Sequence, residues 1–307
     1  MEIREMITEI KGRLDTRGGL KAVIFVACGG SQAAIYPGKY LLEREANEIA
    51  VSIYNSNEFN YVTPKSLDER CIVICCSLKA TAETVHAVER ARQFGAVTIA
   101  MTGSPETGMA KAGEYVVVYS NGDEQIYSQS NQSMALRLGF EILHQFEGYR
   151  LYHEAMAAFD QIDAIVAESK RSMLPAAQSF AVEYQNDPLF QVLGAGPLYG
   201  TAYSMANCHF MEMHWRNAIM IHSGEYFHGP FEMTSETQMA TGRSRFLDER
   251  VLKFLKTYAK RFIVIDAKDT GIEEHIDPRI AEFFNSVVMI PLERFFVEQM
   301  SKLCKHS

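Results

Sequence analysis

The segment from Phe210 to Glu232, FMEMHWRNAIMIHSGEYFHGPFE, holds the two residues of this chain best suited to proton transfer. Glu212 falls in a stretch, 199–215, with few polar positions, which predicts a buried helix. Burial raises the pKa of a carboxylate toward neutrality, as a group that takes and returns a proton requires. His228, in the loop 224–230, adds an imidazole that titrates near neutral pH. The segment predicts an acid–base pair; the alternative is a structurally paired glutamate and a surface histidine.

Two short segments have the composition of a phosphate or sugar site. The turn Cys28-Gly29-Gly30-Ser31 and the segment Ser77-Leu78-Lys79-Ala80-Thr81 each follow an apolar run and open a helical pattern. Backbone amides at a helix start, with hydroxyls and a cation, favour anion binding. The candidate binding residues are Gly29, Gly30, Ser31, Ser77, Lys79 and Thr81. The alternatives are simple strand–helix packing at the first turn, and at the second a helix cap by Thr81 or Ser77 beside a solvated Lys79.

Other motifs have the wrong spacing for a bound cofactor. Gly194-Ala195-Gly196-Pro197 departs from the dinucleotide-binding fingerprint, and the histidines around Glu212 show no familiar metal-ligand spacing. The six cysteines form no C-x-x-C pair, so we expect buried thiols in a reducing compartment. We therefore expect no metal and no organic cofactor.

The composition limits the classes of protein to which this chain can belong. The chain has 307 residues, 47% of them hydrophobic and 22% charged, with a formal net charge of -8. This balance is typical of a globular protein and argues against a nucleic-acid partner. The N-terminal stretch 1–14 reads as an amphipathic helix rather than a signal peptide, and no apolar run is long enough for a bilayer. We expect a cytoplasmic protein without a membrane partner.

Short β-branched apolar runs alternate with helical patterns, which predicts an α/β fold with parallel sheets. Gly-rich turns after an apolar run occur once in each half, at residues 28–31 and 194–197, and indicate a duplicated domain. We expect one domain with an N-terminal helix at 1–150 and a second with a C-terminal helix at 151–307. A strand is expected at Ser286–Pro291. Between Met233 and Glu249 no apolar run occurs, so the second sheet is expected to be smaller unless a segment is missing.

Four segments together resemble the sugar isomerase (SIS) family, and within it the glycated amino acid 6-phosphate deglycases, such as fructose-asparagine and fructoselysine 6-phosphate deglycases. They read FVACGGSQAAIYPGKYLLEREA, YNSNEF, CSLKATAETV and FMEMHWRNAIMIHSGEYFHGPFE. The resemblance implies two SIS domains of flavodoxin-like type, each a parallel sheet with helices on both faces, and a homodimer with active sites formed between subunits. It implies Glu212 as the proton carrier between C1 and C2 and His228 as a second acid–base group. The Ser31 turn and the Ser77–Thr81 segment would hold the sugar phosphate.

The implied activity is cleavage of a C6-phosphorylated Amadori compound, a fructosyl or glucosyl amino acid, to a hexose 6-phosphate and an amino acid. An aldose–ketose phosphosugar isomerase, or a glucosamine-6-phosphate synthase-like isomerase, would use the same pair. A non-catalytic sugar-phosphate sensor is the third alternative, although it has no need for Glu212 and His228. One departure from the family concerns the phosphate segment, which usually reads Ser-x-Ser-Gly-x-Thr or Ser-x-Lys-Gly-x-Thr. Here Ser77–Thr81 is one residue short and lacks the glycine.

Overall fold

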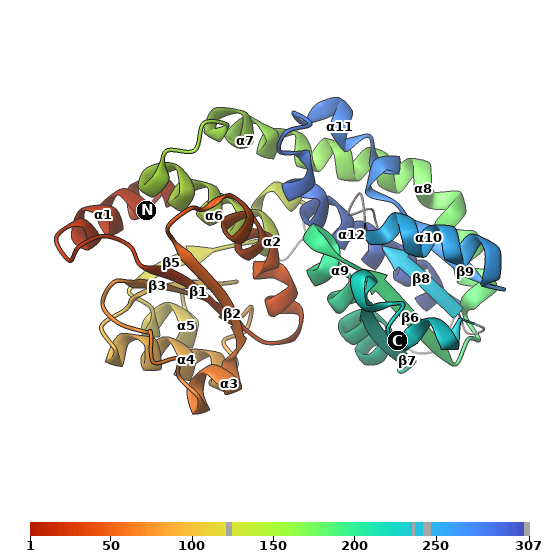
Figure 1. The fold of residues 1–307 in the computed structure, drawn as a ribbon, viewed down its shortest axis with the longest axis horizontal. Helices are drawn as coiled ribbons and strands as arrows, with labels where there is room; N and C mark the ends of the chain where they lie inside the picture. Colours follow the sequence, from red (N-terminus) through yellow and green to blue (C-terminus); the bar gives the residue numbers. More distant parts are fainter. Residues whose placement is uncertain (121–124, 235–236, 242–246, 304–307) are drawn as a thin grey trace. The chain divides into compact units, whose positions relative to one another are not determined.

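The computed structural model describes residues 1–120, 125–234, 237–241 and 247–303. The chain divides into two compact units, Met1–Asp160 and Gln161–Ser307 (Figure 1). Each unit is built around its own parallel sheet. The division falls after Asp160 rather than near residue 150, because α7 (Tyr152–Ala158) packs against α6 (Asn131–Glu147).

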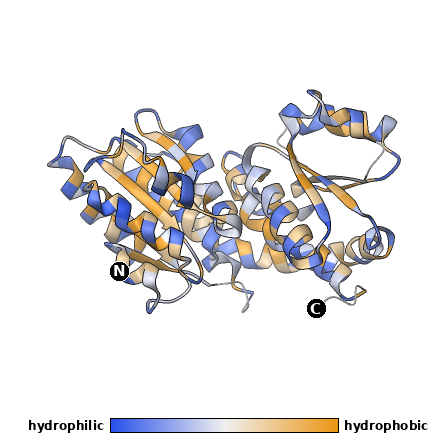
Figure 2. Cartoon of the chain, turned by 90° about the horizontal axis from the view of Figure 1, so that it is seen from below, coloured by the Kyte–Doolittle hydropathy of each residue, from blue (hydrophilic) through white to orange (hydrophobic). Residues whose placement is uncertain are grey.

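The first unit contains a five-stranded sheet in the order β2-β1-β3-β4-β5, with every neighbouring pair parallel. The three inner strands are buried along their whole length, because helices cover both faces of the sheet. Their hydrophobic residues appear orange in Figure 2. The strands are β1 (Ala22–Ala27), β2 (Ala50–Asn55), β3 (Cys71–Cys76), β4 (Val97–Thr102) and β5 (Tyr115–Val118).

Two helical layers cover this sheet (Figure 1). On one side α1 (Ile3–Asp15), α2 (Gly29–Glu45) and α6 pack together, and on the other α3 (Ser56–Tyr61), α4 (Ala82–Gln93) and α5 (Gly108–Ala112) do so. A short 3-10 helix, η1 (Tyr127–Gln129), precedes α6.

α2 and α6 approach each other closely at two glycines. A Cβ atom on Gly38 would lie 2.4 Å from the backbone oxygen of Ala135, and one on Gly139 would lie 3.2 Å from the oxygen of Gly38. A side chain at Gly38 would therefore separate the two helices. This contact fixes α2, and with it the turn that follows β1.

The second unit contains a four-stranded parallel sheet in the order β7-β6-β8-β9. This order repeats that of the first four strands of unit one, since the second strand in the chain flanks the first on one side and the third flanks it on the other. The strands are β6 (Leu189–Gly194), β7 (Asn217–His222), β8 (Thr237–Thr241) and β9 (Phe262–Ile265). The main helices are α8 (Ile162–Tyr184), α9 (Tyr199–Ser204), α10 (Leu247–Tyr258), α11 (Ile272–His275) and α12 (Ala281–Ser301), with a π-helix, η4 (Met205–Met213). Five 3-10 helices complete it: η2 (Phe159–Gln161), which begins at the junction of the units, η3 (Gly196–Leu198), η5 (Ser223–Glu225), η6 (Pro230–Met233) and η7 (Ala267–Thr270).

Within the described residues the second sheet has four strands against five in the first, so it is smaller, as expected. A strand, β8, nevertheless lies between Met233 and Glu249, where the sequence shows no apolar run. It is held by backbone pairing on both sides, to β6 and β9, which its own residues do not reveal. The expected strand at Ser286–Pro291 is part of α12, whose residues from Ser286 to Met289 are all buried. A short stretch of helix buried all round has the same apolar run as a buried strand.

Three of the cysteines, Cys71, Cys75 and Cys76, are buried free thiols as expected, whereas Cys304 lies outside the described residues. Within the described part of the chain, no helix combines the length and hydropathy needed to cross a bilayer.

Candidate active site

In the first unit, both predicted phosphate segments lie at the carboxyl end of the sheet. β1 lies between β2 and β3, so the chain leaves β1 to one side of it and later returns to the other. Ligands of open parallel sheets bind at such a switch point, outside the carboxyl ends of the strands. The turn Gly29–Ser31 follows β1, and the segment Ser77–Thr81 follows β3. The topology thus brings both predicted phosphate segments to one edge of the sheet.

Ser31 connects these two segments. The thiol of Cys76, the residue directly before Ser77, is hydrogen-bonded to the side chain of Ser31 and donates to the hydroxyl of Tyr119. The Cys76 sulfur lies 3.8 Å from the hydroxyl oxygen of Tyr119. Burial raises the pKa of this thiol to about 12, so Cys76 stays neutral and serves as packing. The hydroxyl of Ser31 is therefore directed toward the end of β3.

The turn after β1 depends on glycine at its first position. Gly29 has a φ of 54°, a left-handed conformation that favours glycine. It begins α2, whose first turn contains no acidic residue. Gly30 is exposed beside it. The positive end of this helix therefore faces the edge of the sheet without a carboxylate to compete with an anion.

The segment after β3 is closed by its own hydrogen bonds. The backbone N–H of Thr81 donates to Oγ of Ser77 over 3.0 Å, and Ser77 is buried. Ala80 has a φ of 57°, which is the conformation that a glycine would adopt without strain. The shortened segment thus keeps a left-handed residue although its sequence lacks the family's glycine. Lys79 is exposed next to it.

Of the helix-cap alternative, the part that concerns Ser77 and a solvated Lys79 agrees with these contacts, whereas a cap by Thr81 does not. Thr81 is the N-cap residue of α4, but its side chain makes no capping hydrogen bond. Its hydroxyl instead lies 3.1 Å from that of Thr84 and 3.4 Å from that of Ser77.

Sequence reasoning missed two residues that support this segment, Ser56 and Thr84. The hydroxyl of Thr84 lies 2.9 Å from Oγ of Ser56, and both side chains are buried. The backbone N–H of Ser56 donates to the sulfur of Cys28 over 3.3 Å. A row of hydroxyls thus runs from Ser77 through Thr81 and Thr84 to the end of β2. The spacing of Thr81 and Thr84, one helical turn apart, was the available signal.

Glu212 lies in the second unit, and its expected burial in the chain was wrong. It is in the π-helix η4 and is exposed. Its apolar neighbours are exposed as well: Met211 by 39%, Met213 by 42% and Trp215 by 78%. A π-helix has i→i+5 hydrogen bonds, so the α-helical periodicity used to assign faces no longer applies. The apolar side chains around Glu212 face away from the core of their own unit.

His228 is held at the tip of a firmly anchored turn. It is exposed, and its backbone N–H donates to the oxygen of Glu225 over 2.9 Å. Just before it, Tyr226 is fully buried with its hydroxyl 2.9 Å from that of Thr234. Phe227 packs edge-on against Phe254, with ring centroids 5.4 Å apart. The imidazole is therefore presented to solvent by a backbone that has little freedom to move.

Glu212 and His228 lie toward opposite ends of the same strand. η4 ends shortly before β7 begins, whereas His228 follows the end of β7. A strand of six residues is about 20 Å long. The segments that carry these two side chains therefore join opposite ends of β7.

Comparison with known proteins agrees with the architecture. Residues 20–141 match the SIS domain family. The chain is 33% identical to the fructosamine deglycase FrlB of Bacillus subtilis (strain 168), over 99% of this chain and 93% of that protein. It is 26% identical to the fructoselysine 6-phosphate deglycase of Escherichia coli K12, over 88% of this chain and 79% of that one. A solved structure of a candidate phosphosugar isomerase from Salmonella typhimurium LT2 superposes with a TM-score of 0.93 at 34% identity, covering 99% of this chain and 94% of the other.

Proposed function

The chain belongs to the SIS family, and we propose that it is an enzyme, a deglycase that cleaves a C6-phosphorylated Amadori compound to a hexose 6-phosphate and an amino acid. The observation that carries this proposal is the 33% identity to a fructosamine deglycase over nearly the full length of both proteins. The sheet edge of the first unit supports it, because hydroxyls and helix amides gather there as a phosphate requires. The sugar phosphate would bind at the Ser31 turn and the Ser77–Thr81 segment.

The reaction needs one base that serves two neighbouring carbons. Glu212 would remove a proton from C1 of the ketoamine. The electron pair would form a C1=C2 double bond while the C2 oxygen takes a proton from His228, which gives an enaminol. Return of the proton to C2 gives an imine at C1, which water hydrolyses to the aldehyde and the free amine. His228 would open the sugar ring and relay protons. These steps are balanced without a metal or an organic cofactor.

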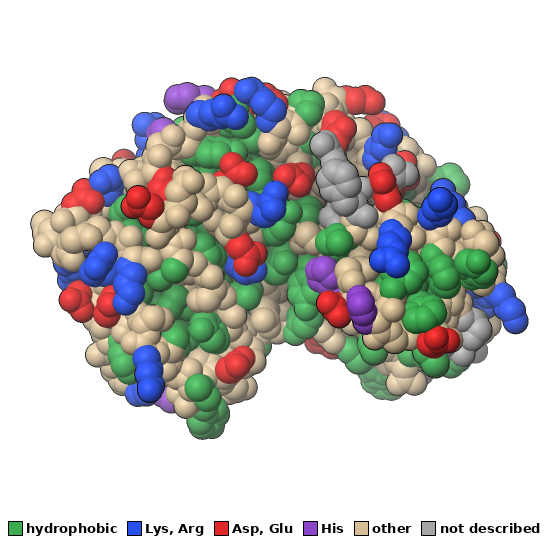
Figure 3. Space-filling model, viewed as in Figure 1, with side chains coloured by type: hydrophobic (Ala, Val, Ile, Leu, Met, Phe, Trp, Pro, Cys, Tyr) green, Lys and Arg blue, Asp and Glu red, His purple; other side chains and the backbone are tan. Residues whose placement is uncertain are grey.

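We infer that the catalytic pair is assembled from two chains of a homodimer. Within one chain, Glu212 and His228 belong to segments at opposite ends of β7. The exposed apolar side chains near Glu212, together with Ile219 on the edge strand β7, form a surface of the kind that a second copy covers. Figure 3 shows hydrophobic side chains at the surface of the second unit. Contact with a partner would then bury Glu212.

We also propose that the second unit is a second SIS domain. Its strand order repeats that of the first unit, and each sheet has a Gly-rich turn after its first strand. The domain boundary would lie between residue 150 and Asp160. The buried free thiols of the first unit favour a reducing, cytoplasmic location.

The experiment that tests this function is a panel of C6-phosphorylated fructosyl and glucosyl amino acids, with glucose 6-phosphate and the free amino acid measured together. The two products should appear in equal amounts. Interconversion of hexose 6-phosphates in place of amine release would instead identify an isomerase. Glu212→Gln should lower the rate by about three orders of magnitude or more, because the amide cannot accept the C1 proton. The matched control is Glu249→Gln, an exposed position on α10.

The shared site is tested by mixing two inactive variants. Glu212→Gln and His228→Asn proteins, incubated together until subunits exchange, should recover part of the activity, since a mixed dimer has one site with both native residues. Each variant incubated with itself is the control. Exchange shown by differently tagged chains without any recovery would mean that both residues act from one chain.

A further inference from the structure

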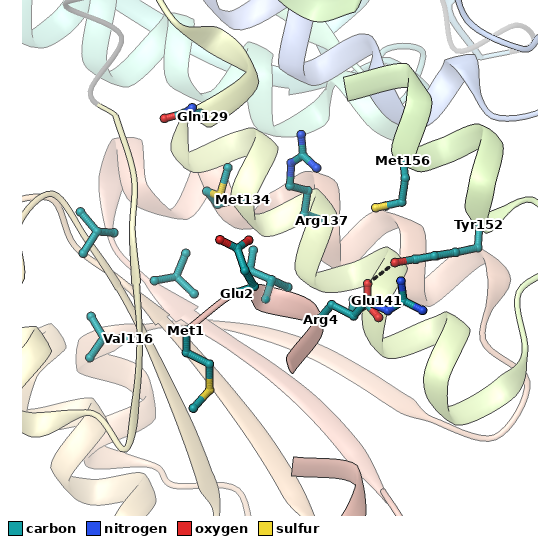
Figure 4. Close-up of a pocket in the computed structure, with 13 residues that line it drawn as sticks. Met1, Glu2, Arg4, Val116, Gln129, Met134, Arg137, Glu141, Tyr152 and Met156 are labelled. Carbon is teal, nitrogen blue, oxygen red and sulfur yellow. Dashed lines mark hydrogen bonds between the residues drawn. The ribbon is translucent and has the colours of Figure 1, made fainter. Parts of the chain in front are cut away.

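The first unit contains a cavity that shares no residue with the candidate phosphate site. Its volume is about 520 Å³, within the range of small-molecule sites. It lies between the start of the chain, strand β5, and the helices α6 and α7 (Figure 4). The lining residues that matter for recognition are Glu2, Gln129, Met134, Arg137, Glu141 and Met156.

Arg137 lines this cavity, and its charge is stabilised by Asp160 and Glu2, although neither pairs with it directly. Its guanidinium carbon lies 3.9 Å from the centroid of the Phe159 ring, so one side of the group is covered by an aromatic face. Its Nε atom is buried and has no hydrogen-bond partner. Among the described residues, no carboxylate lies within ion-pair distance of the guanidinium. Burial lowers the pKa of Arg137, which reflects the cost of holding this charge away from water.

The acidic residue closest to Arg137 along α6 is already committed elsewhere. Glu141 is buried and accepts a hydrogen bond of 2.5 Å from the hydroxyl of Tyr152 and one of 2.7 Å from Nε2 of Gln145. Figure 4 shows the carboxylate of Glu141 directed at Tyr152. Both carboxylate oxygens of Glu141 accept hydrogen bonds from neutral donors, one on α6 and one on α7. Glu141 is therefore not available to pair with Arg137.

We propose that this cavity binds a small molecule with one carboxylate and an apolar body, with the carboxylate on Arg137. A guanidinium binds a carboxylate through two parallel hydrogen bonds from its N–H groups. In the view of Figure 4, Arg137 stands between Met134 and Met156, whose flexible thioether side chains fit ligands of irregular shape. Simple aliphatic acids and apolar α-amino acids share this chemistry. An amino acid would make an additional contact from its ammonium group to Glu2. Amino acids are also the class of product that the proposed function releases.

The proposal is tested by NMR on protein labelled with ¹³C at the methionine methyl groups, with the signals of Met134 and Met156 assigned by substitution. The probes are 4-methylpentanoate, leucine and leucinamide, which separate the carboxylate from the ammonium group. Both acids should shift the two signals in a saturable manner, and leucinamide should not. Equal affinity of the two acids identifies a simple carboxylate site, and tighter binding of leucine identifies an amino acid site.

Two variants locate the contact. Arg137→Gln should weaken binding of the acids about ten- to a hundredfold, as expected for a charge-assisted pair. Gln129→Glu leaves Arg137 in place but adds a negative charge to the wall, and it should weaken both acids as well. The control is Arg150→Gln, an exposed arginine that does not line the cavity. The proposal is wrong if no acid shifts the signals at millimolar concentration, if leucinamide binds as well as leucine, or if both variants bind like the native protein. Because nothing in this assay depends on turnover, its failure leaves the deglycase proposal untouched.

Discussion

Replacing Thr84 by valine should expose the role of the hydroxyl row behind the candidate phosphate segment. The side chain of Thr84 is 1% exposed, and its hydroxyl lies 2.9 Å from that of Ser56 and 3.1 Å from that of Thr81. Valine keeps the shape of threonine but can neither donate nor accept. Thr81 is exposed, so its hydroxyl can hydrogen-bond to water in place of Thr84, whereas the hydroxyl of Ser56 is fully buried and cannot reach water.

The magnitude follows from this asymmetry. A buried hydroxyl left without a partner costs about 1–3 kcal/mol, and a bond lost at an exposed position costs about 0.5–1.5 kcal/mol. The additional methyl group of valine returns less than about 1 kcal/mol. We therefore expect the free energy of unfolding to fall by about 1–3 kcal/mol. If the segment holds phosphate, KM for a phosphorylated substrate should rise more than kcat falls, because the chemistry takes place at the other end of the sugar.

Urea unfolding of four proteins measures this: native, Thr84→Val, Ser56→Ala and the double variant. The double variant should be more stable than the sum of the single effects predicts, by about 1–2 kcal/mol, because neither partner is then left unsatisfied. A loss below about 0.5 kcal/mol for Thr84→Val, or strict additivity, would show that the two hydroxyls do not depend on each other.

Two further predictions concern residues in unfavourable environments. Ala80→Gly should leave the free energy of unfolding unchanged or raise it by up to about 1 kcal/mol, since about 1–2 kcal/mol of left-handed strain is relieved against about 0.4–1 kcal/mol from the freer unfolded chain. The same change at the exposed helical Ala157 should cost about 1 kcal/mol, and an equal loss at both positions would contradict the argument. Glu293 is fully buried, neither of its oxygens has a hydrogen-bond partner in the described part of the chain, and burial raises its pKa well above 4.5. The Glu293 carboxyl group therefore loses its proton at a lower pH in the unfolded chain than in the folded one, so the free energy of unfolding falls as pH rises above 4.5. In urea unfolding, Glu293→Gln should be as stable as the native protein near pH 4 and more stable near pH 8.

The first unit is largely predictable because its strands are local signals. Each inner strand is a short β-branched or apolar run, and the runs at β1 and β3 are each followed by a helical pattern. The second unit is less predictable from its sequence. β8 depends on backbone pairing to strands far away in the sequence, and the buried stretch of α12 has no polar face that would mark it as helical.

The two halves of the candidate site differ in the same way. The Ser31 turn and the Ser77–Thr81 segment meet because parallel strands place their carboxyl ends at one edge, which the sequence allows one to expect. The contact between Ser56 and Thr84 joins the starts of α3 and α4. Its one trace in the sequence is the spacing of Thr81 and Thr84. The environment of Glu212 was misjudged because an apolar helical stretch indicates burial without saying which surface covers it.

That distinction bears on how the enzyme would work. In one chain, Glu212 is surrounded by apolar side chains but open to water, and His228 is held rigidly at the far end of β7. A carboxylate is an effective base for a carbon acid only when water is excluded from it. If a second copy covers this surface, the same contact removes water from Glu212 and brings a histidine to it from the other chain. Assembly and completion of the catalytic site would then be one event, and an isolated chain would bind phosphosugar at its first unit without turning it over.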